Sequence, residues 1–477
     1  MSNWKVGPGG RLYHPTTGAY VGQLDLNGNE QMVPVMATLS DQGVGSGYAK
    51  TLAQAVGEEQ LALNFDIALT RMDYDMRRLG RLGVGNKAVL ALRFDHHTAV
   101  FRDTIKPLLD ARGLPYQMNT HVTELDGSKP ANPTWADVAQ WQYSGCEYFT
   151  HGIDHMAYPN TYQGLWDNVV GCKKTAEANG LIVKGWAMPG LGEPWCFDGL
   201  NVLDDWRGAA GRLLMSNYAI AEAYSGPILL PVTPQPNRYF YGRAHNTIDA
   251  ATLATATGWI DTICRDKKSM RVMCHVGLLG TASFMALASY TTWLDYIVAK
   301  RDAGELEIVL PSALPYVTND TTRLDLLCGT GSFVGVSSSN LAGWTALGGT
   351  YADTEQTGGY NNGPKLVVAI GKSSASYVVR ECTGQGYNGE HFVFEGYCQG
   401  NVAGTDTAKV VITDGLNWTL TKTISGVVPG TWTKVIFPFM LPKLLSNGQT
   451  LQNITIQIGR NGGTSGTEWS NVSIKKI

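Results

Sequence analysis

The sequence predicts a multidomain protein in which a central α/β domain is followed by a C-terminal all-β sandwich. The chain has 477 residues, which at roughly 150 residues per domain is enough for about three domains. Between positions 86 and 317, short apolar runs alternate with amphipathic stretches, as in βαβ units. After position 317 the helical periodicity ends, and β-type runs are separated by Gly, Asn and Asp, as in a β-sandwich.

The first two segments prepare for this core. Residues 1–47 are punctuated by Gly and Pro, and we expect a small, turn-rich β region there. Residues 48–85 predict a helical connector, because apolar residues recur mostly three, four or seven positions apart. This near-heptad spacing fits either a seam between subunits or a helix packed on its own domain. The apolar positions are Leu52, Val56, Leu63, Ile67, Met72, Met76 and Leu79.

The central segment predicts strands that alternate with helices. Residues 87–94 form an apolar run typical of a buried strand, and the amphipathic stretch after it ends at Gly113. Further strands are expected at 147–150, 181–186, 271–274 and 306–310, with a helix at 293–303. This alternation predicts a parallel sheet or barrel.

The C-terminal segment, residues 318–477, predicts an antiparallel, jelly-roll-like β-sandwich. Its expected strands lie at 365–370, 391–394, 408–413, 434–439, 454–458 and 472–474. Their even spacing favours two packed antiparallel sheets over a helical arrangement.

Composition excludes several classes of protein. With 44% hydrophobic and 16% charged residues, the chain is not disordered. Lys and Arg number 37 against 40 Asp and Glu, a net charge of -3, so we expect no nucleic-acid partner. No apolar stretch reaches the length of about 18 residues that suggests membrane insertion. The N-terminus also lacks the pattern of a signal peptide, so we expect synthesis in the cytoplasm of the host cell.

Histidines follow the predicted strands of the central segment. Seven of the nine lie between positions 96 and 275. His96 and His97 come directly after the first strand, His151 after the strand at 147–150, and His275 after the strand at 271–274. Because the carboxyl ends of parallel strands meet at one edge of a sheet, these positions predict a functional site there.

Two of these histidines have the spacing of metal ligands. In His151-Gly-Ile-Asp-His155, a helical turn would place both imidazoles on one face. With His96 from another strand end, they make a three-imidazole site suited to Zn²⁺ with one position left open. Asp95 then stays free to act as a base. Asp95 as a helix cap and His275 as an ordinary buried histidine are the alternatives.

The order of these motifs resembles the NodB-homology polysaccharide deacetylases, carbohydrate esterase family four. Arg93-Phe94-Asp95-His96-His97 stands where that family has T-F-D-D-G, His151 to His155 where it has H-[ST]-x-x-H, and Met273-Cys274-His275 where it has L-x-H. The resemblance covers about half of the chain and implies a deformed (β/α) barrel. It departs at His96, which replaces an aspartate, and at 187–190, which replaces an arginine loop.

The resemblance also implies a mechanism. Metal-assisted hydrolysis would remove acetyl groups, N-linked or O-linked, from a polysaccharide, with Asp95 as general base and His275 as general acid. The groups that tune these two residues would come from Arg93, Arg238, Arg243, Asp205 or Glu222, and His97 and His121 would have supporting roles. Aromatic and apolar residues would line the sugar cleft or pack in the core: Tyr158, Trp186, Pro189 and Trp195.

The N-terminus suggests a setting for this activity. Residues 4–13 and 22–30 resemble the openings of bacteriophage tail fibre and tailspike proteins. We therefore expect a receptor-binding protein of the virion, homotrimeric and in contact with other tail proteins, that deacetylates a bacterial surface polysaccharide. The resemblance implies that residues 1–47 attach the chain to the particle and that residues 318–477 bind carbohydrate or hold the trimer together. Two alternatives remain open: a tail protein that binds glycan without catalysis, and a bacterial deacetylase outside any virion.

Overall fold

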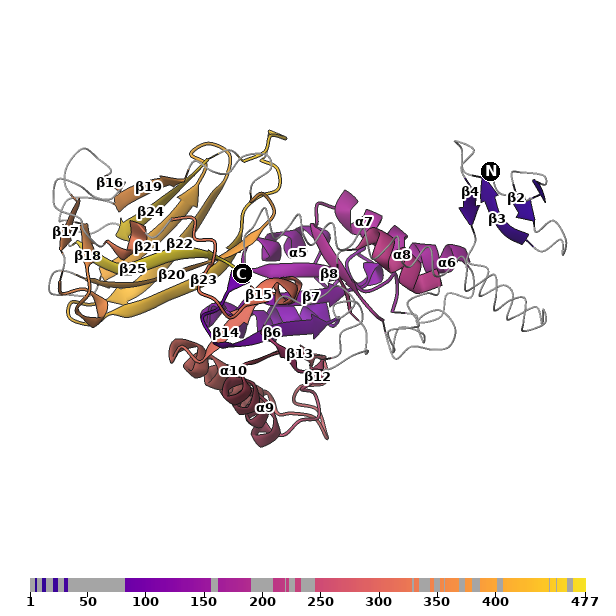
Figure 1. The fold of residues 1–477 in the computed structure, drawn as a ribbon, viewed down its shortest axis with the longest axis horizontal. Coiled ribbons are helices and arrows are strands. Elements are labelled where there is room, and N and C mark those ends of the chain that lie inside the picture. The colour runs from indigo at the N-terminus through magenta and orange to yellow at the C-terminus, as the bar shows by residue number, and fades with distance from the viewer. Residues whose placement is uncertain are drawn as a thin grey trace.

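The computed structural model describes most of the chain from Leu82 onward and four short strands before it (Figure 1). The described ranges are 82–155, 162–189, 209–218, 220–222, 228–232, 245–327, 330–333, 344–346, 352–355, 357–368, 374–379, 387–400, 406–445, 447–451, 453–460 and 466–477. The predicted helical connector falls almost entirely outside these residues.

The N-terminal strands form one antiparallel sheet in the order β1 (Lys5–Val6), β2 (Arg11–Tyr13), β3 (Tyr20–Leu24) and β4 (Glu30–Met32). Hydrogen bonds pair each strand with the next one along the chain. The β-strands expected for this region are therefore present, and the residues that connect them lie outside the described ranges.

A nine-stranded, curled sheet forms the central domain. Its main path runs β10 (Ile220–Glu222), β9 (Val183–Ala187), β8 (Cys146–Thr150), β7 (Tyr116–Thr120), β6 (Ala88–Asp95), β13 (Lys268–Cys274) and β11 (Leu230–Pro231). Two further strands, β12 (Asn246–Thr247) and β14 (Leu306–Val309), pair with β13 and β6. All pairs are parallel except β11 with β13.

Helices cover the outer face of this sheet. Thr98–Val100 (α3) continues through a π-helical turn at Phe101–Ile105 into α4 (Lys106–Ala111), and α6 (Tyr162–Trp166) continues through Asp167–Gly171 into α7 (Cys172–Ala178). The others are α5 (Trp135–Gln142), α8 (Ala209–Asn217), α9 (Leu253–Asp266) and α10 (Leu287–Asp302). Mixed α/β architecture is therefore confirmed. A closed barrel is not, because no backbone pairing joins β10 to β11 or β12, the strands at the other end of the sheet, within the described ranges.

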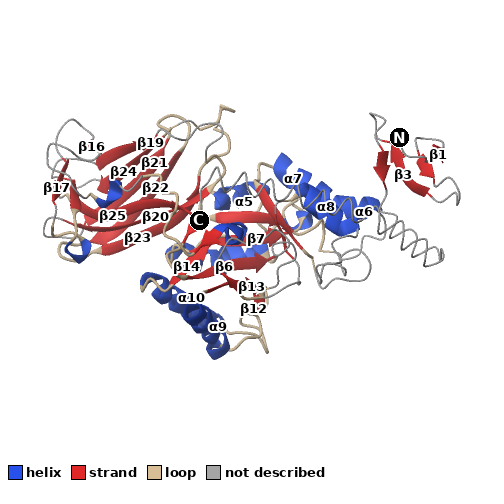
Figure 2. Ribbon diagram, viewed as in Figure 1, coloured by secondary structure: helices blue, strands red, loops and turns tan. Residues whose placement is uncertain are grey.

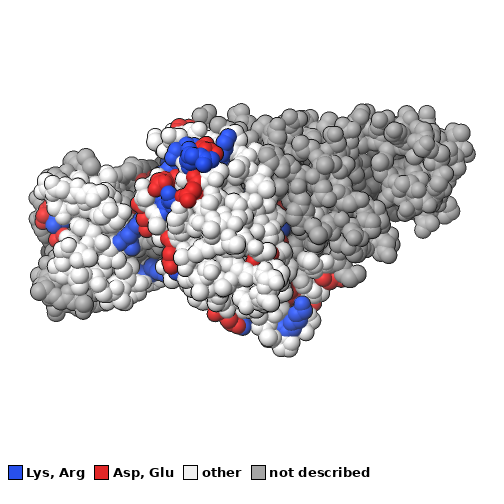
Figure 3. All heavy atoms as spheres, turned by 90° about the horizontal axis from the view of Figure 1, so that it is seen from below, with Lys and Arg blue, Asp and Glu red and all other residues white. Residues whose placement is uncertain are grey.

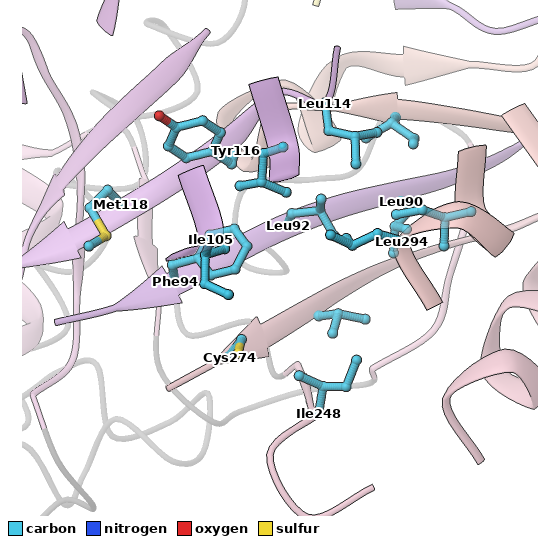
Figure 4. Packing of buried hydrophobic residues seen from close by; sticks show 14 of the residues in the cluster. Leu90, Leu92, Phe94, Ile105, Leu114, Tyr116, Met118, Ile248, Cys274 and Leu294 are labelled. Atoms are coloured by element: carbon cyan, nitrogen blue, oxygen red, sulfur yellow. The ribbon is translucent and has the colours of Figure 1, made fainter. Parts of the chain in front are cut away.

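Strand β6 shows how the sequence assigns its two faces. Alternate side chains of a strand point to opposite sides, and Leu90, Leu92 and Phe94 pack into the core beneath the helices (Figure 4). The other face carries Val89 and Ala91, then Arg93 and Asp95, which are 1% and 2% exposed. The interior of the curled sheet therefore changes from apolar to charged toward the carboxyl end of β6.

The C-terminal domain is a sandwich of two five-stranded antiparallel sheets, as predicted (Figure 2). One sheet runs β16 (Thr345–Ala346), β19 (Ser374–Val379), β24 (Ile454–Arg460), β21 (Asp406–Thr413) and β22 (Thr419–Val427). The other runs β17 (Ala352–Glu355), β18 (Lys365–Val368), β25 (Thr467–Lys476), β20 (His391–Gly400) and β23 (Thr433–Met440). Both sheets contribute to one core, which includes Phe394, Val410 and Ile456.

The sandwich packs directly against the central domain. The His391 ring Nε2 lies 2.9 Å from the Cys146 carbonyl oxygen, and Lys434 Nζ lies 2.8 Å from Asp302 Oδ1. Gly145 has φ +94°, and a Cβ atom there would lie 2.3 Å from Pro438 Cγ. A short two-stranded sheet, β5 (Leu82–Gly83) with β15 (Val317–Thr318), joins the two ends of the central domain.

Charge is sparse on the face shown in Figure 3, where Lys and Arg are interspersed with Asp and Glu. Among the described residues, no helix combines the length and apolar character needed to cross a membrane.

Candidate metal centre

Three histidines converge at the carboxyl ends of β6 and β8. His96 follows β6, and His151 and His155 lie in the segment after β8. One ligand nitrogen from each of the three lies within 4.8 Å of the others. The ring centroids of His96 and His155 are 4.8 Å apart, and those of His151 and His155 are 5.0 Å apart. The structure thus brings together the three predicted ligands.

The way in which they meet differs from the prediction. Residues 151–155 form a bend instead of a helical turn, with φ +81° at Gly152 and +65° at His155. The Asn168 side chain stabilises the bend, because its Oδ1 accepts a hydrogen bond from the Ile153 N–H at 3.0 Å. The expected helical turn is therefore wrong. The sharp reversal, which glycine adopts without strain, brings His155 back toward His151.

The protonation states of these imidazoles suit a metal. Burial lowers the pKa of His96 to about 2 and that of His151 to about 3, and it also lowers the pKa of His155. All three rings are consequently neutral near pH 7, so each has a nitrogen lone pair to donate.

His151 supplies the most direct evidence that the three histidines could hold a metal ion. Its Nδ1 lies 3.1 Å from the Ala187 carbonyl oxygen, so Nδ1 carries the proton and Nε2 is the acceptor. That Nε2 is buried and has no hydrogen-bond partner among the described residues. A buried polar atom without a partner is costly, and coordination of a metal would satisfy it. Three imidazoles with one open position fit Zn²⁺.

Asp95 lies beside this group and is ionised. Arg93 binds it through two hydrogen bonds, Nε to Oδ1 at 2.7 Å and Nη2 to Oδ2 at 2.6 Å, and Asn119 Nδ2 donates to Oδ1 at 2.6 Å. Burial raises the pKa of Asp95, but the charge and hydrogen bonds of Arg93 outweigh it and hold the pKa well below the ordinary value. Of the arginines considered from sequence, Arg93 is therefore the partner of Asp95.

His275 projects from the end of β13, with its ring centroid 5.1 Å from that of His96. Its Nδ1 lies 2.6 Å from Asp249 Oδ2, and its backbone N–H donates to Asp249 Oδ1 at 2.8 Å. Burial lowers the pKa of His275, but the hydrogen bond to Asp249 and the charges of Asp95 and Asp249 raise it above the ordinary value. His275 is thus poised to hold a proton near neutral pH.

Sequence reasoning missed Asp249. It follows the two-residue strand β12, which is too short to show a period-two pattern. The parallel pairing of β12 with β13 brings Asp249 close to His275. The partner of His275 is therefore none of the residues proposed from the sequence. Glu222 contacts Arg93 instead, and Asp205, Arg238 and Arg243 lie outside the described residues.

The neighbouring histidines lie around the three ligands. The His97 backbone N–H donates to Glu124 Oε1 at 3.1 Å, and a Cβ atom on Gly277 would lie 2.8 Å from the His97 ring. His121 Nδ1 lies 3.0 Å from Thr123 Oγ1, and burial lowers its pKa to about 3. Neither belongs to the three-histidine group.

The structure gives little support to the residues predicted to contact sugar. Trp186 is 0% exposed, because it occupies a buried position of β9. This burial fits the alternative given for Trp186, packing in the core, and not a place in an open sugar cleft. Pro189 is buried and would contact a Cβ atom on Gly152 at 3.6 Å, next to His151 of the three-histidine group. Tyr158 and Trp195 lie outside the described residues.

Comparison with known proteins adds little. No protein-family model and no curated protein matches the chain. Among solved structures, CBM22-1-GH10 modules of Clostridium thermocellum xylanase 10B are 20% identical over 28% of this chain and 26% of that one, with a TM-score of 0.23. The CBM22-1 xylan-binding domain of Paenibacillus barcinonensis Xyn10C is 15% identical over 33% and 96%, with a TM-score of 0.26. TmCBM61, in complex with β-1,4-galactotriose, is 10% identical over 32% and 99%, with a TM-score of 0.24.

Proposed function

We propose that this protein is a metal-dependent deacetylase that hydrolyses acetyl groups on a bacterial surface polysaccharide. One observation carries the proposal: the Asp95 carboxylate, paired with Arg93, and the His275 imidazole, paired with Asp249, lie beside the same three-histidine group. Hydrolysis of an acetamide needs a proton acceptor for water and a proton donor for the departing amine. The residues fit both needs.

His96, His151 and His155 would hold a divalent ion of the zinc class. When bound, such an ion supplies Lewis acidity toward the acetyl carbonyl and toward water. Asp95 removes a proton from a water molecule as the water oxygen forms a bond to the acetyl carbon. His275 then gives its proton to the amine as the C–N bond breaks, which leaves acetate and a free amino sugar. Arg93 keeps Asp95 ionised, and Asp249 fixes the His275 ring.

The pairing of Arg93 with Asp95 favours catalysis over mere glycan binding. The loop at 187–190 has no arginine, but the guanidinium arrives from β6 itself, two residues before the base. The choice of polysaccharide as substrate depends on the motif resemblance, and a role in a phage tail depends on the resemblance of residues 4–13 and 22–30. Detection of the protein in purified virions by mass spectrometry tests that setting, in which we propose a homotrimer.

Acetate release from acetylated capsular or exopolysaccharide tests the activity. We expect release by the wild type and a loss of at least a hundredfold in Asp95→Asn, because general-base catalysis typically contributes about 10²–10⁴-fold. Asp126→Asn, which alters an exposed carboxylate bonded to Ser128, is the matched control and should keep full activity. A zinc-loaded wild type that releases no acetate from any acetylated glycan would refute the proposal.

A further inference from the structure

A network of charged and amide side chains fills the upper interior of the curled sheet, and Glu222 is at its centre. Glu222 is the last residue of β10 and is 0% exposed. Its Oε1 accepts a hydrogen bond from Arg271 Nη1. Its Oε2 lies 3.1 Å from Arg93 Nη1 and accepts from Gln117 Nε2 at 2.8 Å. One carboxylate therefore binds side chains from three other strands, β13, β6 and β7.

These side-chain contacts cross the interior of the curled sheet. Along the path β10-β9-β8-β7-β6-β13, Glu222 and Arg271 stand on strands five steps apart. Backbone hydrogen bonds do not join β10 to β13 within the described ranges, yet their side chains form an ion pair. Burying a charge is costly unless it is paired and hydrogen-bonded. Glu222 thus links β10 to β13 through side chains, although no backbone hydrogen bond joins these two strands within the described ranges.

The network leads to Asp95 by two routes. Arg93 directs Nε and Nη2 to Asp95 and Nη1 to Glu222, so both edges of its planar guanidinium are held. In the second route, Gln117 Nε2 contacts Asn119 Oδ1, and Asn119 Nδ2 donates to Asp95 Oδ1. A planar group with five fixed donors and partners on both edges has little freedom to rotate.

We propose that Glu222 is a positioning residue for the base: it fixes the plane of Arg93 and thereby the orientation of the Asp95 carboxylate toward the three-histidine group. Glu222 acts mainly through Arg93 and secondarily through Gln117 and Asn119. Among the described residues, no hydrogen bond or ion pair joins Glu222 directly to Asp95 or to the three histidines. The orientation of the base then depends on the curl of the sheet, because Glu222 comes from the edge strand β10. The catalytic part of this inference rests on the proposed deacetylase function.

A double-mutant cycle tests this dependence. Glu222→Gln keeps the shape and removes the charge, and Arg93→Lys keeps the charge and removes the two-edged fork. We expect Glu222→Gln to lower kcat by about tenfold to a hundredfold, the usual effect of losing a supporting partner, with KM and metal content unchanged. In the Arg93→Lys background the same change should lower kcat by a few-fold at most, because residues that act through each other are not additive.

Glu147→Gln is the matched control. Glu147 is equally buried on β8 and accepts a hydrogen bond from the Ser312 N–H at 2.9 Å, and no hydrogen bond or ion pair joins it to Arg93 or Asp95 among the described residues. Its kcat should stay at the wild-type value. An unchanged kcat in Glu222→Gln, or an equal loss in both backgrounds, would overturn the proposal.

The same cycle on urea unfolding needs no substrate. Glu222→Gln should raise the unfolding equilibrium constant by a smaller factor in Arg93→Lys than in the wild type, and equal factors would overturn the inferred link. The wild type could release no acetate while the two backgrounds still differ in how Glu222→Gln changes the unfolding equilibrium constant. In that case the deacetylase proposal fails and the link between Glu222 and Arg93 stands. The two failures are therefore distinguishable.

Discussion

Replacing Asp249 by asparagine tests the role assigned to His275. Both carboxylate oxygens of Asp249 accept hydrogen bonds from His275, one from the ring at 2.6 Å and one from the backbone N–H at 2.8 Å. Asparagine has a single acceptor oxygen, so one of these donors would face an NH₂ group. Without the carboxylate, burial is left to lower the pKa of His275, and the basic limb of the pH–rate profile should move to lower pH.

The size of the effect follows from the bond that is lost. A hydrogen bond to a charged group contributes about 1.5–3 kcal/mol, and the His275 side chain is 27% exposed, so solvent screens it little. At about 1.4 kcal/mol per tenfold, acetate release should fall by about tenfold to a hundredfold above the shifted pKa. Below it, where His275 is protonated in both proteins, the difference should shrink to a few-fold.

The assay is kcat/KM for acetate release from pH 5 to 9, with Asp126→Asn as control. Stability should follow the same sign. Because the folded pKa of His275 is raised, its bond to Asp249 stabilises the protein fully below the unfolded pKa of about 6.5, and this contribution is lost as pH rises through the folded value. A loss of activity that is the same at every pH would refute the role of Asp249 in holding the proton on His275.

Further predictions concern stability and the metal. His96, His121, His151 and His391 have pKa values lowered to about 2 or 3, so the metal-free protein should lose stability as pH falls from about 6.5 toward 3, because the unfolded chain binds more protons; urea unfolding at pH 7 and pH 5 with equal midpoints would contradict this. Arg93→Gln leaves the buried Asp95 without its cation and should destabilise the fold by about 3–5 kcal/mol, measured by urea unfolding, whereas the exposed Arg265→Gln should change it by less than about 0.5 kcal/mol. Gly145→Ala places a Cβ atom 2.3 Å from Pro438 at φ +94° and should destabilise the contact between the two domains by about 1–3 kcal/mol; calorimetry that shows a wild-type Tm would refute the tight packing.

Local patterns predicted much of this architecture, because the relevant information lies within single strands and helices. The continuous apolar run in β6 identifies a buried strand, and the positions of His96, His151 and His275 after strands identify the edge of the sheet that carries the candidate site. Because every second side chain of a strand points to the same face, Arg93 and Asp95 lie on one face of β6. Their pairing can therefore be predicted from the sequence once the strand is assigned.

The rest depends on contacts between distant segments. Asp249 meets His275, and Glu222 meets Arg271, only through the register of strands that no local pattern fixes. The bend at 151–155 arises from Gly152 and from Asn168 on a neighbouring helix, so helical spacing misled the prediction. Trp186 has the aromatic side chain typical of sugar-binding residues, but this side chain is fully buried in the structure.

Metal analysis of the purified protein tests the central claim most directly. After incubation with excess Zn²⁺ and desalting, the wild type should retain about one ion per chain, as expected for a three-imidazole site. His155→Ala should lose it together with acetate release, whereas His121→Ala, which removes a neighbouring imidazole outside the group, should retain it. A wild type that holds no metal under these conditions, or equal retention by both variants, would contradict the assignment of His96, His151 and His155 as ligands.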